Sequence, residues 1–169
     1  MRTLLLVRHA KSSWDDPSLA DRERPLTRRG RRSARKMGQR LAKRGLARPD
    51  ARPELVLSSP AVRALKTARL IARRLRYRRR DIAVQEDLYG TTAAHLLKAV
   101  RSLNERYGRV MLVGHNPEIT ALARRFSTAI VHMPTCAVVC FTFDAQSWAD
   151  VGRDSLKHMN VDTPRKLKE

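Results

Sequence analysis

The chain is poor in acidic residues and in cysteine, and it has no long apolar run. Its 169 residues include 16 Asp and Glu against 36 Lys and Arg, which gives a formal net charge of +20. A field of that sign attracts phosphates, acidic proteins and nucleic acids, but it does not determine the fold. The hydrophobic fraction of 42% and the apolar periodicity exclude a wholly disordered chain.

The few cysteines and the short apolar runs limit the cellular setting. Cys136 and Cys140 lie four positions apart, without the further Cys or His residues of a zinc site. We therefore expect buried, reduced thiols in a cytoplasmic protein. The N-terminal apolar run, residues 4–7, ends at Arg8 and is too short for a secretory signal. No run approaches transmembrane length, so we expect no membrane partner.

Short apolar runs alternate with segments of helical period along the chain. The runs at 3–7, 54–59, 109–114 and 136–143 predict buried strands. Helices are predicted from Thr27 to about residue 43, from Pro60 behind a Ser59 cap, and over residues 93–107. This order predicts an α/β fold, a three-layer α/β/α sandwich with a mostly parallel central sheet. We expect one domain over residues 1–160 and a loose tail over 161–169.

Polar residues follow three of the predicted strands. Arg8 and His9 follow the first strand, Arg63 lies in the first turn of the helix after the second, and His115 and Asn116 follow the third. In sheets of this kind, ligands bind beyond the carboxyl ends of the strands. We therefore expect two histidines and two arginines to converge on one edge of the sheet.

Residues of these types suit phosphoryl transfer. Guanidinium groups match phosphate oxygens, and a neutral imidazole is a competent nucleophile. A second histidine, kept in its protonated form by the negative charge of the phosphate that it faces, can donate to an equatorial oxygen. The helix N-termini after Ser59 and Asn116 add N–H donors, so Asn116 is a predicted substrate-binding residue. Because the positive charges are built in, we expect no metal and no other cofactor.

Four ordered motifs, "VRHAKSSW", "RPLTRRG", "LSSPAVRALKTA" and "LVGHNP", resemble the histidine phosphatase superfamily, the phosphoglycerate-mutase-like group. They resemble most its small SixA-type phosphohistidine phosphatase branch, over residues 3–143. The resemblance implies a phosphoglycerate-mutase-like fold. It also implies that His9 is the nucleophile and forms a phosphohistidine intermediate. Arg8, Arg63 and His115 would clamp the phosphoryl group.

The remaining predicted site residues follow from the same resemblance. Ala10 replaces the glycine usual after Arg-His, as in many SixA-like members. Lys11 and Ser12 would supplement the phosphate-binding cup. Glu86 in "EDLYG" matches the general acid of many relatives, with Asp87 as the neighbour that could substitute. An imidazole leaves more readily than an alkoxide, so a phosphohistidine substrate needs less help from an acid.

Three functions agree with these residues. The first is a metal-independent phosphatase acting through His9 on phosphohistidine proteins. The second is a hydrolase of small phosphoesters, such as a sugar phosphate or a nucleotide. The third is a non-catalytic, basic module that binds phosphate or nucleic acid. The arginine runs "RRGRR" and "RYRRR" lack interleaved aromatics and any nucleic-acid motif, which disfavours the third.

The length of the chain favours a simple version of the fold. Larger relatives use inserted lids, whereas the chain between residues 81 and 108 holds only one short loop and one helix. We expect an open pocket and, as partner, a phosphorylated protein or a small phosphorylated molecule. Arg24 is expected to hold its loop against the sheet. The oligomeric state does not follow from the sequence.

Overall fold

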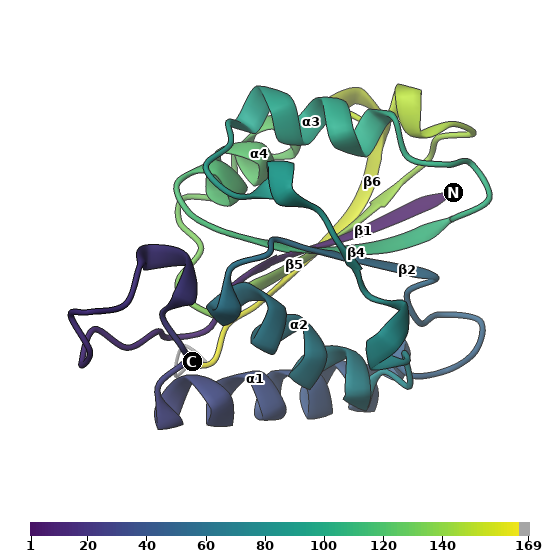
Figure 1. Ribbon diagram of the computed structural model, residues 1–169. Coiled ribbons are helices and arrows are strands. Elements are labelled where there is room, and N and C mark those ends of the chain that lie inside the picture. Colours follow the sequence, from purple (N-terminus) through teal and green to yellow (C-terminus); the bar gives the residue numbers. More distant parts are fainter. Residues whose placement is uncertain (166–169) are drawn as a thin grey trace.

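The computed structural model describes residues 1–165 as three layers, with a six-stranded sheet in the middle (Figure 1). The strand order is β3-β2-β4-β1-β5-β6. The strands are β1 (Arg2–Arg8), β2 (Leu55–Ser58), β3 (Ala83–Val84), β4 (Arg109–Gly114), β5 (Val138–Phe143) and β6 (Leu156–Asp162). Strands β1 to β4 are parallel, whereas β5 pairs antiparallel with both β1 and β6. The predicted α/β sandwich with a mostly parallel sheet is confirmed.

Two pairs of helices cover the two faces of the sheet. Helices α1 (Arg28–Leu41) and α2 (Val62–Arg74) lie on one face, and α3 (Ala93–Arg101) and α4 (Glu118–Phe126) on the other (Figure 1). Helix α1 turns Ala34, Met37 and Leu41 inward, each at most 1% exposed. Thr27 caps it, since its Oγ1 accepts a hydrogen bond from the backbone N–H of Gly30 at 2.9 Å.

Strand β1 is buried on both faces, and this burial fixes the position of the residues at its carboxyl end. Leu4 and Leu6 belong to the core cluster beneath α3 and α4, whereas Leu5 and Val7 belong to the cluster beneath α1 and α2. All four are 0% exposed, and burying one such side chain contributes roughly 1.5–3 kcal/mol. A slip of the strand register by one residue would move Leu4 and Leu6 to the opposite face of the sheet. The packing therefore fixes the register, and with it the position of His9 just after the strand.

Two helix ends differ from the sequence prediction. Helix α2 begins at Val62 rather than Pro60, because Ala61 is extended (φ −57°, ψ 136°) and Ser59 Oγ accepts from Ala61 N at 3.2 Å. Helix α3 ends at Arg101 rather than at residue 107. There the Asn104 side chain accepts from Arg106 N at 3.0 Å, and such a turn competes with a helix.

The C-terminal part of the chain forms the edge strand β6. The predicted domain boundary at residue 160 falls inside this strand, which continues to Asp162. Asp162 forms ion pairs with Arg40, in the last turn of α1, and with Arg44, just after that helix. These ion pairs keep residues 161 and 162 on the sheet. Residues 166–169 of the predicted tail lie outside the described residues.

The two thiols lie in and beside the core. Cys136 and Cys140 are free; the first is buried and the second half-buried. Burial raises the pKa of Cys136 to about 12, so this thiol is protonated at neutral pH. Within residues 1–165, every helix is too short or too polar to cross a lipid bilayer.

Candidate active site

The carboxyl ends of β1 and β4 bring two histidines together. The backbone N–H of His9 donates to the carbonyl of Gly114 at 3.0 Å, which joins the two strand ends. The ring centroids of His9 and His115 are 5.2 Å apart. Each histidine is only 8% exposed, and Arg63 is 6% exposed. The expected convergence of these residues on one edge of the sheet is therefore present.

The ring of His9 has a defined tautomer. Its Nδ1 lies 2.7 Å from the carbonyl oxygen of Ala10, which can only accept, so Nδ1 carries the proton. Nε2 is then an unprotonated nitrogen. Burial, and then the nearby cations of Arg63 and Arg8, lower the pKa of His9 to about 4. The imidazole is therefore neutral at neutral pH, which is the form able to act as a nucleophile.

His115 is held by a serine from another strand end. Ser59, which follows β2, places its Oγ 2.7 Å from Nε2 of His115. The buried Nδ1 of His115 has no hydrogen-bond partner within residues 1–165. Burial, and then the proximity of His9 and Arg63, lower the pKa of His115 to about 3. The ring of Tyr89 packs against that of His115 edge to face, with centroids 5.5 Å apart.

The two predicted arginines keep part of their donor capacity free. Arg8 donates from Nη1 to the carbonyl of Met133 at 3.1 Å. Arg63 donates from Nη1 and Nη2 to Asp21. The Nε atoms of both arginines are buried without a partner among the described residues. Two guanidinium groups beside two neutral imidazoles make a cationic cup suited to a phosphate dianion.

Asp21 connects the loop after β1 to this cup. Its carboxylate accepts from Arg63 at 2.9 Å, from Arg24 at 3.2 Å and from the hydroxyl of Tyr89. The hydrogen bond from Tyr89, followed by the Arg63 guanidinium, holds the pKa of Asp21 well below its usual range. Arg24 also donates to Ser12 and stacks on the exposed ring of Trp14. This loop is thus fixed to the cup by charged contacts.

The three predicted substrate-binding residues have different surroundings. Lys11 is held through its backbone, whose carbonyl accepts from Thr27 N, while its side chain is exposed. Ser12 accepts from Arg24. The amide of Asn116 is used by the protein itself, since Nδ2 donates to Met133 O and Oδ1 accepts from Thr120. Asn116 therefore anchors the segment that also receives Arg8.

The two candidate acids, Glu86 and Asp87, have exposed side chains. The carboxylate of Glu86 pairs with Arg22 at 2.8 Å and its side chain is 74% exposed. Asp87 pairs with His95 at 2.9 Å. Within the described part of the chain, neither carboxylate makes a hydrogen bond or ion pair with His9 or His115. The geometry thus brings the arginines and histidines together but leaves Glu86 outside their hydrogen-bond network.

Sequence reasoning missed three residues of this network. It gave Ser59 only a capping role and assigned no role to Asp21 or Tyr89. One signal was available for Asp21, because it lies in the loop that directly follows the predicted strand end at His9. Arg24 was expected to hold its loop against the sheet. Its side chain instead contacts Ser12, Ser13 and Asp21 within the loop, and through Asp21 it reaches the carboxylate that faces Arg63. In residues 1–165, no three His, Cys, Asp or Glu side chains are grouped so as to bind a metal ion.

Comparison with known proteins identifies the family. The model of the histidine phosphatase superfamily (branch 1) matches residues 4–89, which hold Arg8, His9, Arg63 and Glu86. The chain belongs to the histidine phosphatase superfamily. An uncharacterized chloroplastic protein of Arabidopsis thaliana is 31% identical over 157 residues, which cover 88% of this histidine phosphatase and 70% of that relative.

Solved structures show the same architecture for this histidine phosphatase. A candidate phosphohistidine phosphatase SixA from Agrobacterium tumefaciens superposes with a TM-score of 0.80 at 25% identity, covering 97% of this chain and 99% of that one. The protein histidine phosphatase SixA, solved with tungstate, gives a TM-score of 0.76 at 22% identity, covering 96% and 97%. The fold is thus that of the SixA structures, and the chain is a phosphatase.

Proposed function

We propose that this protein is a phosphohistidine phosphatase in which His9 Nε2 attacks phosphorus. The observation that supports this most is the hydrogen bond from His9 Nδ1 to the Ala10 carbonyl, which leaves Nε2 unprotonated beside the buried Arg63 and the half-buried Arg8. A neutral imidazole held at a rigid strand end needs no further activation.

In the first step, the phosphoryl group lies against Arg8, Arg63 and His115. The Nε2 lone pair of His9 forms a bond to phosphorus as the bond to the leaving group breaks. The leaving imidazole of the substrate departs with the electron pair of that bond and takes up a proton. Arg8 and Arg63 neutralise the charge on the equatorial oxygens. A phosphate dianion beside His115 raises the pKa of that imidazole from its low value, so that it becomes a donor to one oxygen.

In the second step, water attacks the phosphorus of phosphorylated His9. The P–N bond breaks, its electron pair returns to Nε2, and inorganic phosphate leaves after the water has lost a proton. Because Nδ1 takes no part in either step, we expect its hydrogen bond to Ala10 to be retained throughout. The same cationic cup serves both transition states.

The position of Glu86 supports a phosphohistidine rather than an ester substrate. An alkoxide leaving group requires a positioned acid, whose contribution is about a hundredfold or more. Glu86 is exposed and paired with Arg22, whereas an imidazole leaving group needs little help. We therefore expect Glu86→Gln to change the hydrolysis of phosphohistidine little.

Trapping of the covalent intermediate tests the proposal. The wild-type protein is mixed with a ³²P-labelled phosphohistidine protein and quenched rapidly in alkali, in which phosphohistidine survives. Acid-labile label is expected on the wild type and on a His158→Ala control, whose histidine is exposed on β6. It is expected to be absent from His9→Ala. Label retained by His9→Ala would remove His9 as the nucleophile.

A substrate panel separates phosphohistidine from small phosphoesters. The same preparations are assayed for kcat/KM on a phosphohistidine protein, a sugar phosphate and a nucleotide. A higher kcat/KM on phosphohistidine is expected. If a phosphoester is the better substrate and Glu86→Gln abolishes its turnover, the protein is an ester hydrolase instead.

A further inference from the structure

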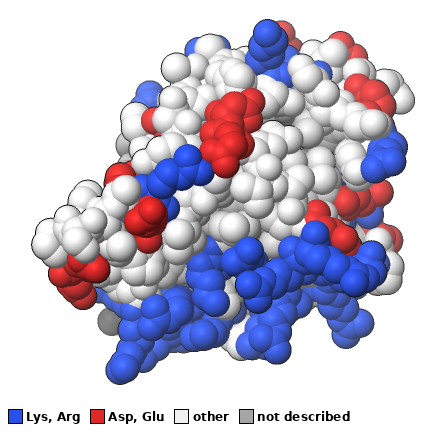
Figure 2. All heavy atoms as spheres, viewed as in Figure 1, with Lys and Arg blue, Asp and Glu red and all other residues white. Residues whose placement is uncertain are grey.

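The excess positive charge lies on one layer of the molecule. Residues 28–80 contain 20 of the 36 Lys and Arg but only two acids, Asp50 and Glu54, which leaves 16 basic and 14 acidic residues in the rest of the chain. This segment includes α1 and α2. Figure 2 shows Lys and Arg covering the lower part of the molecule, where Figure 1 places these helices. A charge serving general solubility would not need to be confined to one layer.

A groove runs along α2 within this basic layer. It consists of four adjoining pockets of about 240, 610, 440 and 560 Å³. Arg69 lines the first three, and Tyr77 lines the last two. The groove begins at Pro60 and Val62, and Val62 directly precedes Arg63 of the catalytic cup in the sequence. We call this the α2 groove, with walls and floor that include Leu65, Lys66, Arg69, Arg73, Arg79 and Arg80.

The cations in the middle of the α2 groove have no acidic partners. Within residues 1–165, the side chains of Lys66, Arg69, Arg79 and Arg80 form no ion pair, whereas Arg2, outside the groove, pairs with Glu105 at 2.7 Å. The Nε atom of Arg69 is buried and lacks a hydrogen-bond partner. Burial, and then the nearby charge of Arg79, lower the pKa of Arg69. Cations held close together without acids form a site for an external anion.

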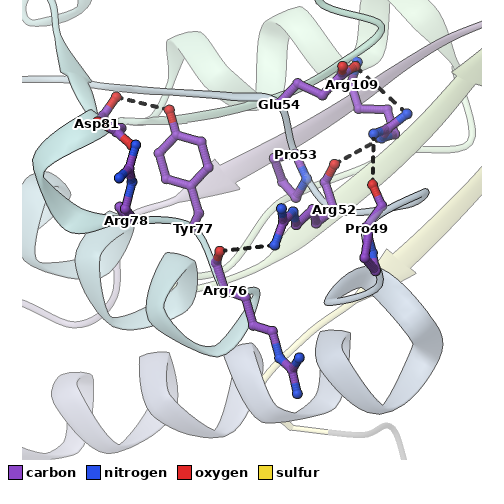
Figure 3. A pocket seen from close by; sticks show the side chains of 9 residues that line it. All are labelled: Pro49, Arg52, Pro53, Glu54, Arg76, Tyr77, Arg78, Asp81 and Arg109. Carbon is purple, nitrogen blue, oxygen red and sulfur yellow. Dashed lines mark hydrogen bonds and ion pairs between the residues drawn. The ribbon is translucent and has the colours of Figure 1, made fainter.

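The far end of the α2 groove differs from its middle. In Figure 3, Arg109 donates to the carbonyls of Arg52 and Pro49. Arg78 pairs with Asp81 at 2.8 Å in the same pocket. These guanidiniums are already occupied by the protein. The unpartnered charge therefore lies between this end and the catalytic cup.

The shape and lining of the α2 groove favour a polypeptide. Helix α2 has 13 residues, or about 20 Å, which is the length of about six extended residues. Leu65 and Ile82 give the groove apolar surface between its arginines, and these match alternating apolar and acidic side chains. A single-stranded nucleic acid would require aromatic rings for stacking. The lining offers only Tyr77, whose hydroxyl donates to the carbonyl of Asp81.

We propose that the α2 groove docks an extended acidic segment of the phosphoprotein substrate and so holds its phosphorylated side chain at the cup. As substrate docking, this rests on the proposed function. Binding of an acidic segment can be measured independently of turnover. The same cations would recognise carboxylates in any extended segment of this kind.

Peptide binding to the full-length protein tests the docking. The probe is a fluorescent hexapeptide of alternating Glu and Leu, measured by anisotropy, with a Gln/Leu peptide as reference. Arg79→Glu/Arg80→Glu, at exposed positions of the groove, is compared with Arg124→Glu/Arg125→Glu. The latter lies on α4 across the sheet and changes the net charge equally. We expect the groove variant to weaken binding of the Glu/Leu peptide at least about tenfold and the control less than about twofold.

Other results would overturn the docking. Equal weakening in both variants would reduce the effect to net charge, and equal binding of the Gln/Leu peptide would remove carboxylate recognition. Tighter binding of a deoxythymidine oligonucleotide, lost in the same groove variant, would make the groove a polynucleotide site. Turnover of a small phosphoramidate is measured in parallel and is expected to be unchanged in both variants. Its absence from the wild type would contradict the proposed function alone, because peptide binding does not depend on it.

Discussion

The carboxylate of Asp21 lies 2.9 Å from Nη2 of Arg63, and the backbone carbonyl of Asp21 lies 2.6 Å from Nη1 of the same guanidinium. A phosphoryl group binding at Arg63 therefore meets a guanidinium whose two Nη atoms already have acceptors. Phosphate competes with Asp21 for the two Nη–H groups that these hydrogen bonds use. The buried Nε of Arg63, which has no partner among the described residues, is a donor that phosphate can engage without competition.

Asp21→Asn is expected to lower the free energy of unfolding by about 1 kcal/mol, because charged hydrogen bonds to Arg63 and Arg24 are lost at a half-exposed carboxylate. Inorganic phosphate should then stabilise the variant more than the wild type, since Arg63 is free to bind it. Urea denaturation with and without phosphate measures both effects. Asp15→Asn, at an exposed position in the same loop, is the control. Equal stabilisation of variant and wild type would contradict the competition.

The low pKa values of His9 and His115 predict a pH-dependent stability. Both groups are neutral in the folded protein down to about pH 4 and 3, whereas an unfolded histidine titrates near 6.5. The unfolded state therefore binds more protons between these values, and stability falls as the pH is lowered below about 6.5. Each histidine contributes a slope of at most about 1.4 kcal/mol per pH unit.

Denaturation by urea at pH 7 and pH 5 checks this dependence. His9→Asn/His115→Asn should lose less stability than the wild type between these pH values, because two of the titrating groups are absent. His132→Ala/His158→Ala, at exposed positions, is the matched pair. A loss of stability as large in the His9/His115 variant as in the wild type would show that the two buried imidazoles do not cause it.

Gly30→Ala is expected to destabilise the protein by about 1–3 kcal/mol, although alanine normally favours a helix. A Cβ at this position would lie 2.1 Å from the carbonyl oxygen of Lys11, which is backbone and cannot move alone. Gly38→Ala on the same helix is the comparison. Its Cβ would lie 2.9 Å from Cγ of Arg74 and 3.2 Å from Cα of Ile71, contacts longer than the one at Gly30, so we expect a smaller destabilisation. Thermal unfolding compares the two variants, and an equal effect would contradict the close approach.

Ser59→Ala is expected to reduce kcat about tenfold with little change in KM, because His115 loses the partner of its Nε2 at 2.7 Å. Ser59 acts as a positioning residue, so the tautomer of His115 should change as well, which ¹⁵N NMR detects. Ser58 is also buried, and among residues 1–165 its hydroxyl donates only to the Ser59 carbonyl, so Ser58→Ala is the control. An unchanged His115 tautomer in Ser59→Ala would leave Ser59 a purely structural role.

The sequence predicted well those parts that depend on local periodicity. The apolar run before Arg8 predicts a buried strand of a parallel sheet. Ligands bind at the carboxyl ends of such strands, which places Arg8 and His9 in the site. Arg63 and His115 follow in the same way from the strands before them. These inferences need only the repeat of apolar residues and the rule for parallel sheets.

The sequence could not place residues whose position depends on distant partners. Asp21 lies in a loop without periodicity, and its conformation is set by Arg63, from a helix 42 positions away. Ser59 has the local pattern of a helix cap, but its hydroxyl is engaged by His115, 56 positions away. Glu86 was predicted from a motif, whereas its carboxylate pairs with Arg22. Tertiary contacts override local patterns at these three places.

The central position of β1, paired along its length with β4 and β5, has a consequence for the dynamics of the site. The amide of His9 donates to Gly114, so its hydrogen should exchange with solvent among the slowest and only when the sheet opens. The loop that holds Asp21 is exposed and joined mainly by side-chain contacts, so its amides should exchange through smaller openings. The attacking atom thus belongs to the most slowly opening unit of the protein. The acceptor that competes with phosphate for Arg63 belongs to a unit that can open while the sheet stays closed.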